Sequence, residues 1–424
     1  MQNKTKKRLK LVLILTPVAL VLILAVVALG AWHKFGAFIV AARSIYKLQD
    51  GLYVMEYRGD YGFDKFLAQG GAADDSAVAD YLIGFLSGGY YKKADNEIKP
   101  GDFGCTTVCV KDKKGAVYFG RNFDWEKGRA MIVHTVPKNG YESLSTCCLD
   151  FLGFGDDYQP DGSMQERIQT LAAIYVPLDG MNEKGLVIAD LMAGDDEETH
   201  QKTDKPDLTT TTAIRLLLDR AANVDEAIEL LKQYDMNSSI GAAHHFAIAD
   251  KSGKSVVVEH VNGEMLVAET NIVTNHYLAD SEKKGVGDED SHLRFDNISS
   301  ICEAIQILNQ ELQDIEQWHL ENEGLGISAA LTPEETKRLE QEPRQSRTPE
   351  RTCRYLLMSV AQSNYPQTDD GNAVTLWSIV YAPGKQWADF FFRENFQKGR
   401  RLFLHPEINN KNQFISDAPV VFID

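Results

Sequence analysis

Residues 104–125 read GCTTVCVKDKKGAVYFGRNFDW. Two runs rich in β-branched and aromatic residues, 106–110 and 117–119, flank the sequence DKKG at 112–115, which is typical of a hairpin turn. We therefore predict two antiparallel strands here, and the rest of the chain has to be arranged around them.

The predicted hairpin would bring three reactive side chains together. Cys105 opens the first strand, Arg121 follows it by 16 residues, and Asp124 follows Arg121 by 3. A cysteine is nucleophilic as the thiolate, which a nearby cation favours. The pattern indicates an amide hydrolase in which Cys105 is the nucleophile, Arg121 favours its thiolate and Asp124 orients its base. The alternatives are a buried structural cysteine and a surface Arg–Asp ion pair of little energetic value.

Three further blocks follow in order: DGMNEKGL at 179–186, VTNH at 273–276 and SHLRF at 291–295. With the run after Gly104, they resemble the choloylglycine hydrolase and acid ceramidase family over roughly residues 105 to 395. Members are N-terminal-nucleophile hydrolases of linear amides and include penicillin V acylases. The resemblance implies an α+β fold, the four-layer αββα sandwich, with no cofactor.

The resemblance also implies that the chain is cut before Cys105. Family members open their mature chain with Cys-Thr, whereas Cys105 is internal, so the Gly104–Cys105 bond must be cleaved. The freed α-amine, with a reference pKa of about 7.7–8.0, would accept the thiol proton. Residues 1–104 contain no cysteine, so unlike acid ceramidase the two pieces could be held together only by packing. Both self-cleavage and cleavage by a protease remain open.

Three more site residues are implied by the resemblance. Asn275 would donate to the oxyanion, and Arg294 would support the charge balance of the site. Met192 stands where members place an Asn or Tyr that faces the substrate. Methionine cannot donate a strong hydrogen bond, so either a backbone amide replaces it or the substrate is more apolar. The alternatives are a turn-capping role for Asn275 and a surface role for Arg294.

The first residues have a different character. Five basic residues between 4 and 10 precede an uncharged apolar run at 11–32. The run exceeds the roughly 20 residues that span a bilayer and the about 7–15 residues of a signal-peptide core. We expect a cytoplasmic tail at 1–10, a transmembrane anchor (or a removed signal peptide) at 11–32, a pro-segment at 33–104 and a catalytic domain at 105–424.

Local patterns predict the remaining elements. The predicted strands are 52–57, 171–176, 186–191, 245–249, 255–259, 271–274, 376–381 and 389–392. The predicted helices are 33–48, 64–69, 76–86 with Ser76 as N-cap, 210–221, 224–234 with Asn223 as N-cap, 296–312 and 333–363. A turn is expected at 99–102, and Asn182 is interpreted as a structural turn residue.

Composition excludes several classes of protein. The net charge of −17 argues against binding to nucleic acid, whose phosphates would be repelled. The six cysteines show no zinc-binding spacing, and we expect no metal. We interpret His244, His245 and His276 as core or strand-end residues. An extracytoplasmic location would permit disulfides among the cysteines other than Cys105, but their pairing stays open.

The sequence therefore predicts a membrane-anchored, extracytoplasmic hydrolase that cleaves linear, non-peptide C–N amide bonds through an acyl thioester on Cys105. N-acyl amino acids or N-acyl lipids are the expected substrates, ahead of bile-salt or penicillin V types. One alternative is an acyltransferase, since residues 274–276 also resemble isopenicillin-N acyltransferases. Another is an uncleaved surface binding protein, and a secreted form of the hydrolase is a variant. The oligomeric state stays open.

Overall fold

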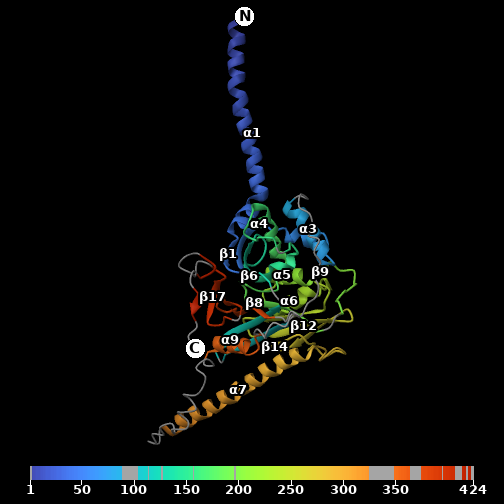
Figure 1. Cartoon of the computed structure of the whole chain (residues 1–424), viewed down its shortest axis with the longest axis vertical. Helices are drawn as coiled ribbons and strands as arrows, with labels where there is room; N and C mark the ends of the chain where they lie inside the picture. Colours follow the sequence, from blue (N-terminus) through green and yellow to red (C-terminus); the bar gives the residue numbers. More distant parts are fainter. Residues whose placement is uncertain are drawn as a thin grey trace.

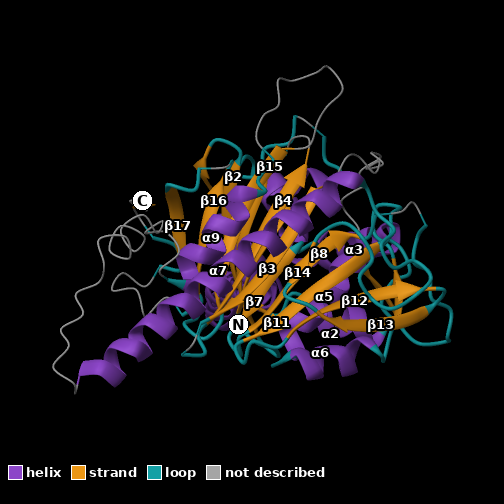
Figure 2. Ribbon diagram, turned by 90° about the horizontal axis from the view of Figure 1, so that it is seen from below, coloured by secondary structure: helices purple, strands orange, loops and turns teal. Residues whose placement is uncertain are grey.

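Two β-sheets packed face to face carry the fold, and helices cover both outer faces (Figure 2). The computed structural model describes residues 2–87, 104–112, 114–125, 128–155, 157–194, 197–323, 348–362, 374–393, 395–405, 413–416 and 419–421. The turn predicted at 99–102 and the helical prediction for 333–347 lie outside these residues.

The larger sheet has nine strands in the order β1-β2-β5-β6-β7-β8-β11-β12-β13. Their bounds are β1 Tyr46–Gln49, β2 Leu52–Gly59, β5 Ala130–Pro137, β6 Ser143–Cys148, β7 Asp179–Asn182, β8 Leu186–Met192, β11 His244–Asp250, β12 Ser255–Val261 and β13 Glu264–Glu269. The smaller sheet has seven strands in the order β14-β3-β4-β15-β16-β17-β18. Their bounds are β14 Ile272–Val273, β3 Gly104–Lys111, β4 Val117–Trp125, β15 Val374–Ala382, β16 Trp387–Phe392, β17 Lys398–Phe403 and β18 Val420–Val421.

Three buried hydrophobic clusters separate the four layers. The first lies between the nine-stranded sheet and the helices α1 Gln2–Ser44, α2 Phe63–Ala68, α3 Asp75–Ser87, α4 Met164–Thr170, α5 Thr210–Arg220 and α6 Val224–Leu231. The second fills the space between the sheets, and the third lies under α7 Glu289–Glu323 and α9 Pro349–Ser359. This arrangement confirms the predicted four-layer αββα sandwich. A short parallel pair, β9 Asp207–Thr209 and β10 Asp235–Asn237, lies apart from both sheets.

The central hairpin forms as predicted. β3 and β4 pair antiparallel in a register that places Gly104 opposite Asp124 and Cys105 opposite Phe123. Alternate residues of a strand point to opposite faces, so Cys105 and Phe123 enter the core between the sheets while Asp124 faces the α7–α9 layer. The hairpin thus presents the predicted nucleophile and the predicted acid on opposite faces of one sheet.

The segment before Cys105 is built into the nine-stranded sheet. β2 pairs parallel with β5, from Leu52 opposite Ala130 to Gly59 opposite Pro137, and its side chains are almost all buried. The helix predicted at 33–48 ends at Ser44, because Tyr46–Gln49 pairs with β2 as an edge strand. The segment 33–87 therefore contributes two sheet strands and several core residues.

Helix α1 projects from the domain, and its two parts differ in burial (Figure 1). Phe38, Ala41 and Ile45 belong to the core cluster, whereas the large apolar side chains between residues 20 and 29 are more than half exposed. In the described part of the chain no single helix is long and apolar enough to cross a membrane. Two stretches, Leu20–Gly30 and Trp32–Ser44, are long and apolar enough only when taken together, and the chain bends by 56° between them.

Two predictions of secondary structure are wrong. The predicted strand 171–176 is a 3-10 helix, Leu171–Tyr175, which continues α4 and is buried. A short buried apolar run fits either a strand or a helix, and here the preceding helix decides. The partner of β8 is instead β7. The predicted cap Ser76 lies inside α3, and Asp74 accepts a hydrogen bond from the Ala77 amide in its place.

Other local predictions are confirmed. Asn223 caps α6 by accepting from the Glu226 amide over 3.0 Å. The Asn182 side chain accepts from the amides of Lys184 and Leu186 and donates to two backbone carbonyls at the end of α5, which supports a structural role. All six cysteines are free thiols.

Candidate active site

Cys105 lies at the start of β3, between the two sheets, and is 2% exposed. Its backbone nitrogen donates to Asn275 Oδ1 over 2.7 Å. Its Sγ lies 3.6 Å from Arg121 Nη2. The structure therefore brings Cys105, Arg121 and Asn275 together, although Asn275 lies 170 residues further along the chain than Cys105.

Arg121 is buried beside the thiol and is held by acceptors on the nine-stranded sheet. It forms an ion pair with Asp179 and donates to the carbonyls of Leu178 over 3.0 Å and Asp190 over 2.7 Å. Burial opposes the charged guanidinium, but the Asp179 carboxylate outweighs it, and the pKa of Arg121 is raised. The guanidinium is therefore a fixed positive charge next to Cys105 Sγ.

The thiol itself is not ionised in this state. Burial raises the pKa of Cys105 to about 11, although the nearby Arg121 charge opposes the increase. At neutral pH only a small fraction would be thiolate, so the thiol needs a base that takes its proton during the reaction.

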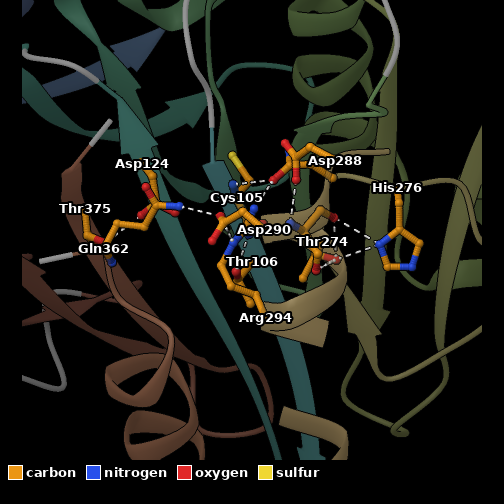
Figure 3. A network of polar contacts seen from close by, with 12 residues as sticks. Cys105, Thr106, Asp124, Thr274, His276, Asp288, Asp290, Arg294, Gln362 and Thr375 are labelled. Carbon is orange, nitrogen blue, oxygen red and sulfur yellow. Dashed lines mark hydrogen bonds and ion pairs between the residues drawn. The ribbon is translucent and has the colours of Figure 1, made fainter. Parts of the chain in front are cut away.

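Asp124 lies beside the peptide bond that precedes Cys105 (Figure 3). Its Oδ1 accepts from Thr375 Oγ1 over 2.5 Å, whereas its buried Oδ2 has no hydrogen-bond partner among the residues that the structure describes. A Cβ placed on Gly104 would lie 2.7 Å from this Oδ2. Burial raises the pKa of Asp124 to about 6, and Arg294 partly offsets that effect.

Asn275 is held at both ends of its side-chain amide. Oδ1 accepts from Cys105 N and from Arg294 Nη2 at 3.0 Å, and Nδ2 donates to the Met192 carbonyl over 3.0 Å. Since all three partners require this orientation of the amide, its oxygen faces the Cys105 nitrogen. One N–H of Nδ2 remains for another acceptor, so the oxyanion role of Asn275 stays a prediction.

Arg294 comes from α7 and closes the site from the helical layer (Figure 3). Its Nη1 donates to the Cys105 carbonyl over 2.5 Å and to Thr106 Oγ1 over 2.9 Å. Its Nε donates to Asp290, which also accepts from Gln362. Arg294 therefore fixes the backbone on the other side of the Cys105 α-carbon, which agrees with its predicted place in the site.

Met192 lies at the end of β8 and is half-buried. It pairs with His244 across β8 and β11, and its backbone carbonyl binds Asn275. The structure therefore places Met192 at the site through its main chain. The substrate-facing role of its side chain stays a prediction.

Asp190 and His244 form a buried pair that sequence reasoning missed. His244 Nδ1 lies 2.9 Å from Asp190 Oδ1, and its Nε2 lies 3.0 Å from the Ser239 carbonyl. Burial lowers the pKa of His244, but the Asp190 carboxylate outweighs it and the pKa is raised. The same Asp190 offers its carbonyl to Arg121. No local motif marks the pair, since its members lie on different strands.

Comparison with known proteins agrees with this geometry. Residues 105–277 match the family model described as linear amide C–N hydrolases, choloylglycine hydrolase family. The match to the choloylglycine hydrolase family covers this part of the chain. The predicted family is thereby confirmed, and the match begins at Cys105 itself.

Two relatives have activities in their names. The chain is 31% identical over 100 residues to penicillin V acylase of Pectobacterium atrosepticum, which is 21% of this chain and 26% of that protein. It is 28% identical over 188 residues to bile salt hydrolase/transferase of Clostridium perfringens, 40% of this chain and 51% of that protein. The chain thus spans about half or less of the length of these two relatives.

A solved structure can be added to these relatives. A conjugated bile acid hydrolase from Clostridium perfringens matches with a TM-score of 0.44 and 17% identity, over 76% of this chain and 97% of that chain.

Proposed function

We propose that the chain is a cysteine N-terminal-nucleophile hydrolase that cleaves linear, non-peptide C–N amide bonds after cleavage between Gly104 and Cys105. The observation that carries this proposal is the position of Cys105: its Sγ lies 3.6 Å from Arg121 Nη2 and its nitrogen 2.7 Å from Asn275 Oδ1. A freed amine at this nitrogen would be held beside the thiol and could act as its base.

The surroundings of Gly104 support cleavage at this bond. A side chain at Gly104 would meet Asp124 Oδ2 at 2.7 Å and Gln362 Nε2 at 3.0 Å, so Asp124 would have to shift to admit one. In the proposed step, the Cys105 thiol gives its proton to water as Sγ attacks the Gly104 carbonyl carbon, the C–N bond breaks and the nitrogen leaves as an amine. The Asp124 carboxyl, next to this bond and with a raised pKa, can supply the proton that the leaving nitrogen takes. Water then hydrolyses the thioester.

The catalytic cycle would use the same atoms. The Cys105 amine takes the thiol proton, and Sγ attacks the substrate carbonyl to form a tetrahedral oxyanion. Collapse of this intermediate expels the substrate amine, which takes its proton from the Cys105 α-ammonium. Water activated by the same amine then releases the acid from the thioester. Arg121 stabilises the thiolate whenever it forms, and Asn275 keeps the amine oriented.

The substrate class follows from two features. Met192 puts an apolar residue at the predicted substrate-facing position, and the exposed apolar part of α1 is rooted in the core of the domain. We propose N-acyl amino acids or N-acyl lipids as substrates, with α1 as a membrane anchor that keeps the catalytic domain extracytoplasmic. The basic residues before the apolar run would keep the N-terminus in the cytoplasm.

An acyltransferase is the second candidate. One matched relative is named bile salt hydrolase/transferase, so its name gives that protein both activities. In transfer, an amine replaces water in the attack on the Cys105 thioester. Supplying an acyl donor with and without a free amine separates the two, because transfer yields a new amide where hydrolysis yields the free acid.

The deciding experiment is intact mass and N-terminal sequencing of wild type and Cys105→Ala, followed by assay of N-acyl amino acids. A new terminus reading Cys-Thr-Thr in wild type alone, with release of free acid, is the expected result. The same new terminus in both proteins would indicate a separate protease. An uncut 47.4 kDa chain in both, without turnover, would favour the binding-protein alternative.

A further inference from the structure

A buried carboxylate and a buried imidazole hold the segment that carries Asn275. Glu259 Oε1 accepts from the Leu278 amide over 2.7 Å, and Oε2 accepts from the Ala279 amide over 3.0 Å. Oε1 also lies 3.2 Å from His245 Nδ1. The other ring nitrogen, His245 Nε2, lies 2.9 Å from the Thr274 carbonyl. Glu259 therefore binds one end of the segment 274–279 directly and the other end through His245.

The contacts define the hydrogen bonding of this pair. Both neighbours of the imidazole, the Glu259 carboxylate and the Thr274 carbonyl, are acceptors, so both ring nitrogens of His245 act as donors. Burial alone would raise the pKa of Glu259, but His245 and the two amides outweigh it, and this pKa is lowered. Both side chains are completely buried. The pair is thus a buried hydrogen-bonded pair with its acceptors and donors satisfied.

The pair also connects the two sheets. Glu259 and His245 stand on β12 and β11 of the nine-stranded sheet, whereas Thr274 directly follows β14 of the seven-stranded sheet. The contact between His245 and the Thr274 carbonyl lies one residue before Asn275. On its other side Thr274 Oγ1 binds Ser291, which precedes Arg294 on α7. Asn275 is therefore flanked by fixed backbone on both sides.

We propose that Glu259 and His245 are positioning residues, which hold the Thr274 carbonyl and thereby keep Asn275 Oδ1 against the Cys105 nitrogen. This inference rests on the proposed function for its catalytic meaning. The pair contacts neither the thiol nor the proposed substrate position. It acts by fixing the direction in which Asn275 points, so its loss would lower the rate of the chemical step more than the affinity for substrate.

Two variants test the inference. In His245→Gln, the single amide group can donate to Glu259 or to Thr274, but not to both. In Glu259→Gln, the carboxamide offers one oxygen to three donors and turns an N–H group toward at least one of them. His260→Gln is the matched control, because His260 neighbours Glu259 on β12 and is also buried, but its Nε2 has no partner in the described structure.

We expect kcat to fall about 10–100-fold in His245→Gln and Glu259→Gln, with KM changed less than about twofold. We expect His260→Gln to keep kcat within about twofold. Equal kcat in all three variants would overturn the inference, because it would leave the pair a purely structural role.

A second readout does not depend on turnover. In the uncleaved Cys105→Ala chain, the amide of residue 105 donates to Asn275, so its hydrogen exchange reports the position of Asn275 directly. We expect faster exchange of this amide when His245→Gln is added and no change when His260→Gln is added. Unchanged exchange in both would refute the positioning role. If wild type hydrolyses no amide, the proposed function fails, and this exchange measurement still decides the inference.

Discussion

The nitrogen of Cys105 donates a hydrogen bond to Asn275 Oδ1 over 2.7 Å while it is still a peptide nitrogen. The proposed cleavage would turn that nitrogen into an amine without moving its partner. Arg294, which binds both the Cys105 carbonyl and Asn275, holds the geometry from the other side. The site is therefore organised around the cleavage position before any cleavage takes place, and the predictions below depend on this arrangement.

Replacing Arg121 by leucine should impair both activity and folding. The substitution removes the charge that favours the thiolate and leaves the Asp179 carboxylate buried without its partner. Breaking a buried ion pair in this way costs about 3–5 kcal/mol, and we expect kcat/KM to fall at least about 100-fold. Urea denaturation and amide hydrolysis measure the two effects. Arg220→Leu, which breaks the exposed pair with Asp64, should cost at most about 1 kcal/mol. Equal losses in both variants would contradict the assigned role of Arg121.

Gly104→Ala should prevent cleavage. Its Cβ would lie 2.7 Å from Asp124 Oδ2, and relief of that contact must shift the bond that is to be cut. The control is Gly84→Ala in α3, where a Cβ meets no atom within 4 Å. It should cleave normally and be about 0.4–1 kcal/mol more stable. Intact mass after purification reports both, and complete cleavage of Gly104→Ala would show that the bond tolerates a side chain.

Asp124 should make the uncleaved chain less stable as the pH rises. Its pKa is raised to about 6, against 3.8 as the reference, so the folded state retains a proton that the unfolded state has lost between these values. The folded state is favoured fully below the reference pKa, and the advantage is lost by about pH 6, which amounts to about 3 kcal/mol.

Urea denaturation of Cys105→Ala with and without Asp124→Asn, at pH 4 and pH 7, measures the contribution of Asp124 to the free energy of unfolding. The loss of stability on going from pH 4 to pH 7 should be smaller by about 2 kcal/mol in the Asn variant, because the unfolded carboxyl has already lost part of its proton at pH 4. Asp389, whose pKa is also raised to about 6, contributes equally to both proteins and cancels. Identical pH dependence in the two proteins would contradict the buried, protonated Asp124.

After cleavage, residues 1–104 should stay bound to the rest of the chain without a covalent link. β2 pairs with β5 along its full length, and Met55 and Tyr57 on β2 are completely buried. We expect the two pieces to copurify and to separate on a denaturing gel without reductant, because all six thiols are free. Val54→Asp on β2 should release the N-terminal piece, whereas the exposed Arg58→Ala should not. A mature protein that consists of residues 105–424 alone would contradict the prediction.

Local sequence predicted the parts of the fold that depend on local contacts. The DKKG turn determines the β3–β4 register, which brings Arg121 beside the Cys105 thiol and places Asp124 beside Gly104 on the opposite face of the sheet. Asn275 and Arg294 were found only through resemblance, because their contacts with Cys105 span 170 and 189 residues.

No sequence motif marked Glu259 and His245 as a pair. Each looks like an ordinary strand residue in the sequence, and its role depends on the Thr274 carbonyl, which comes from the other sheet. The strand predicted at 171–176 was wrong for a local reason. Buried apolar residues without alternating polar residues do not distinguish a strand from a helix.

Two truncations should separate the proposed anchor from the fold. Deletion of residues 1–32 removes the exposed apolar part of α1, and we expect a protein that leaves the membrane fraction but keeps its melting temperature and its cleavage. Deletion of residues 1–44 also removes Phe38, Ala41 and Ala42, which are buried in the core, and large apolar residues lost from a core cost about 2–5 kcal/mol each. This second protein should melt earlier by many degrees or fail to fold. Membrane fractionation and thermal melting measure both outcomes, and persistence of the first truncation in the membrane fraction would place the membrane contact elsewhere on the domain.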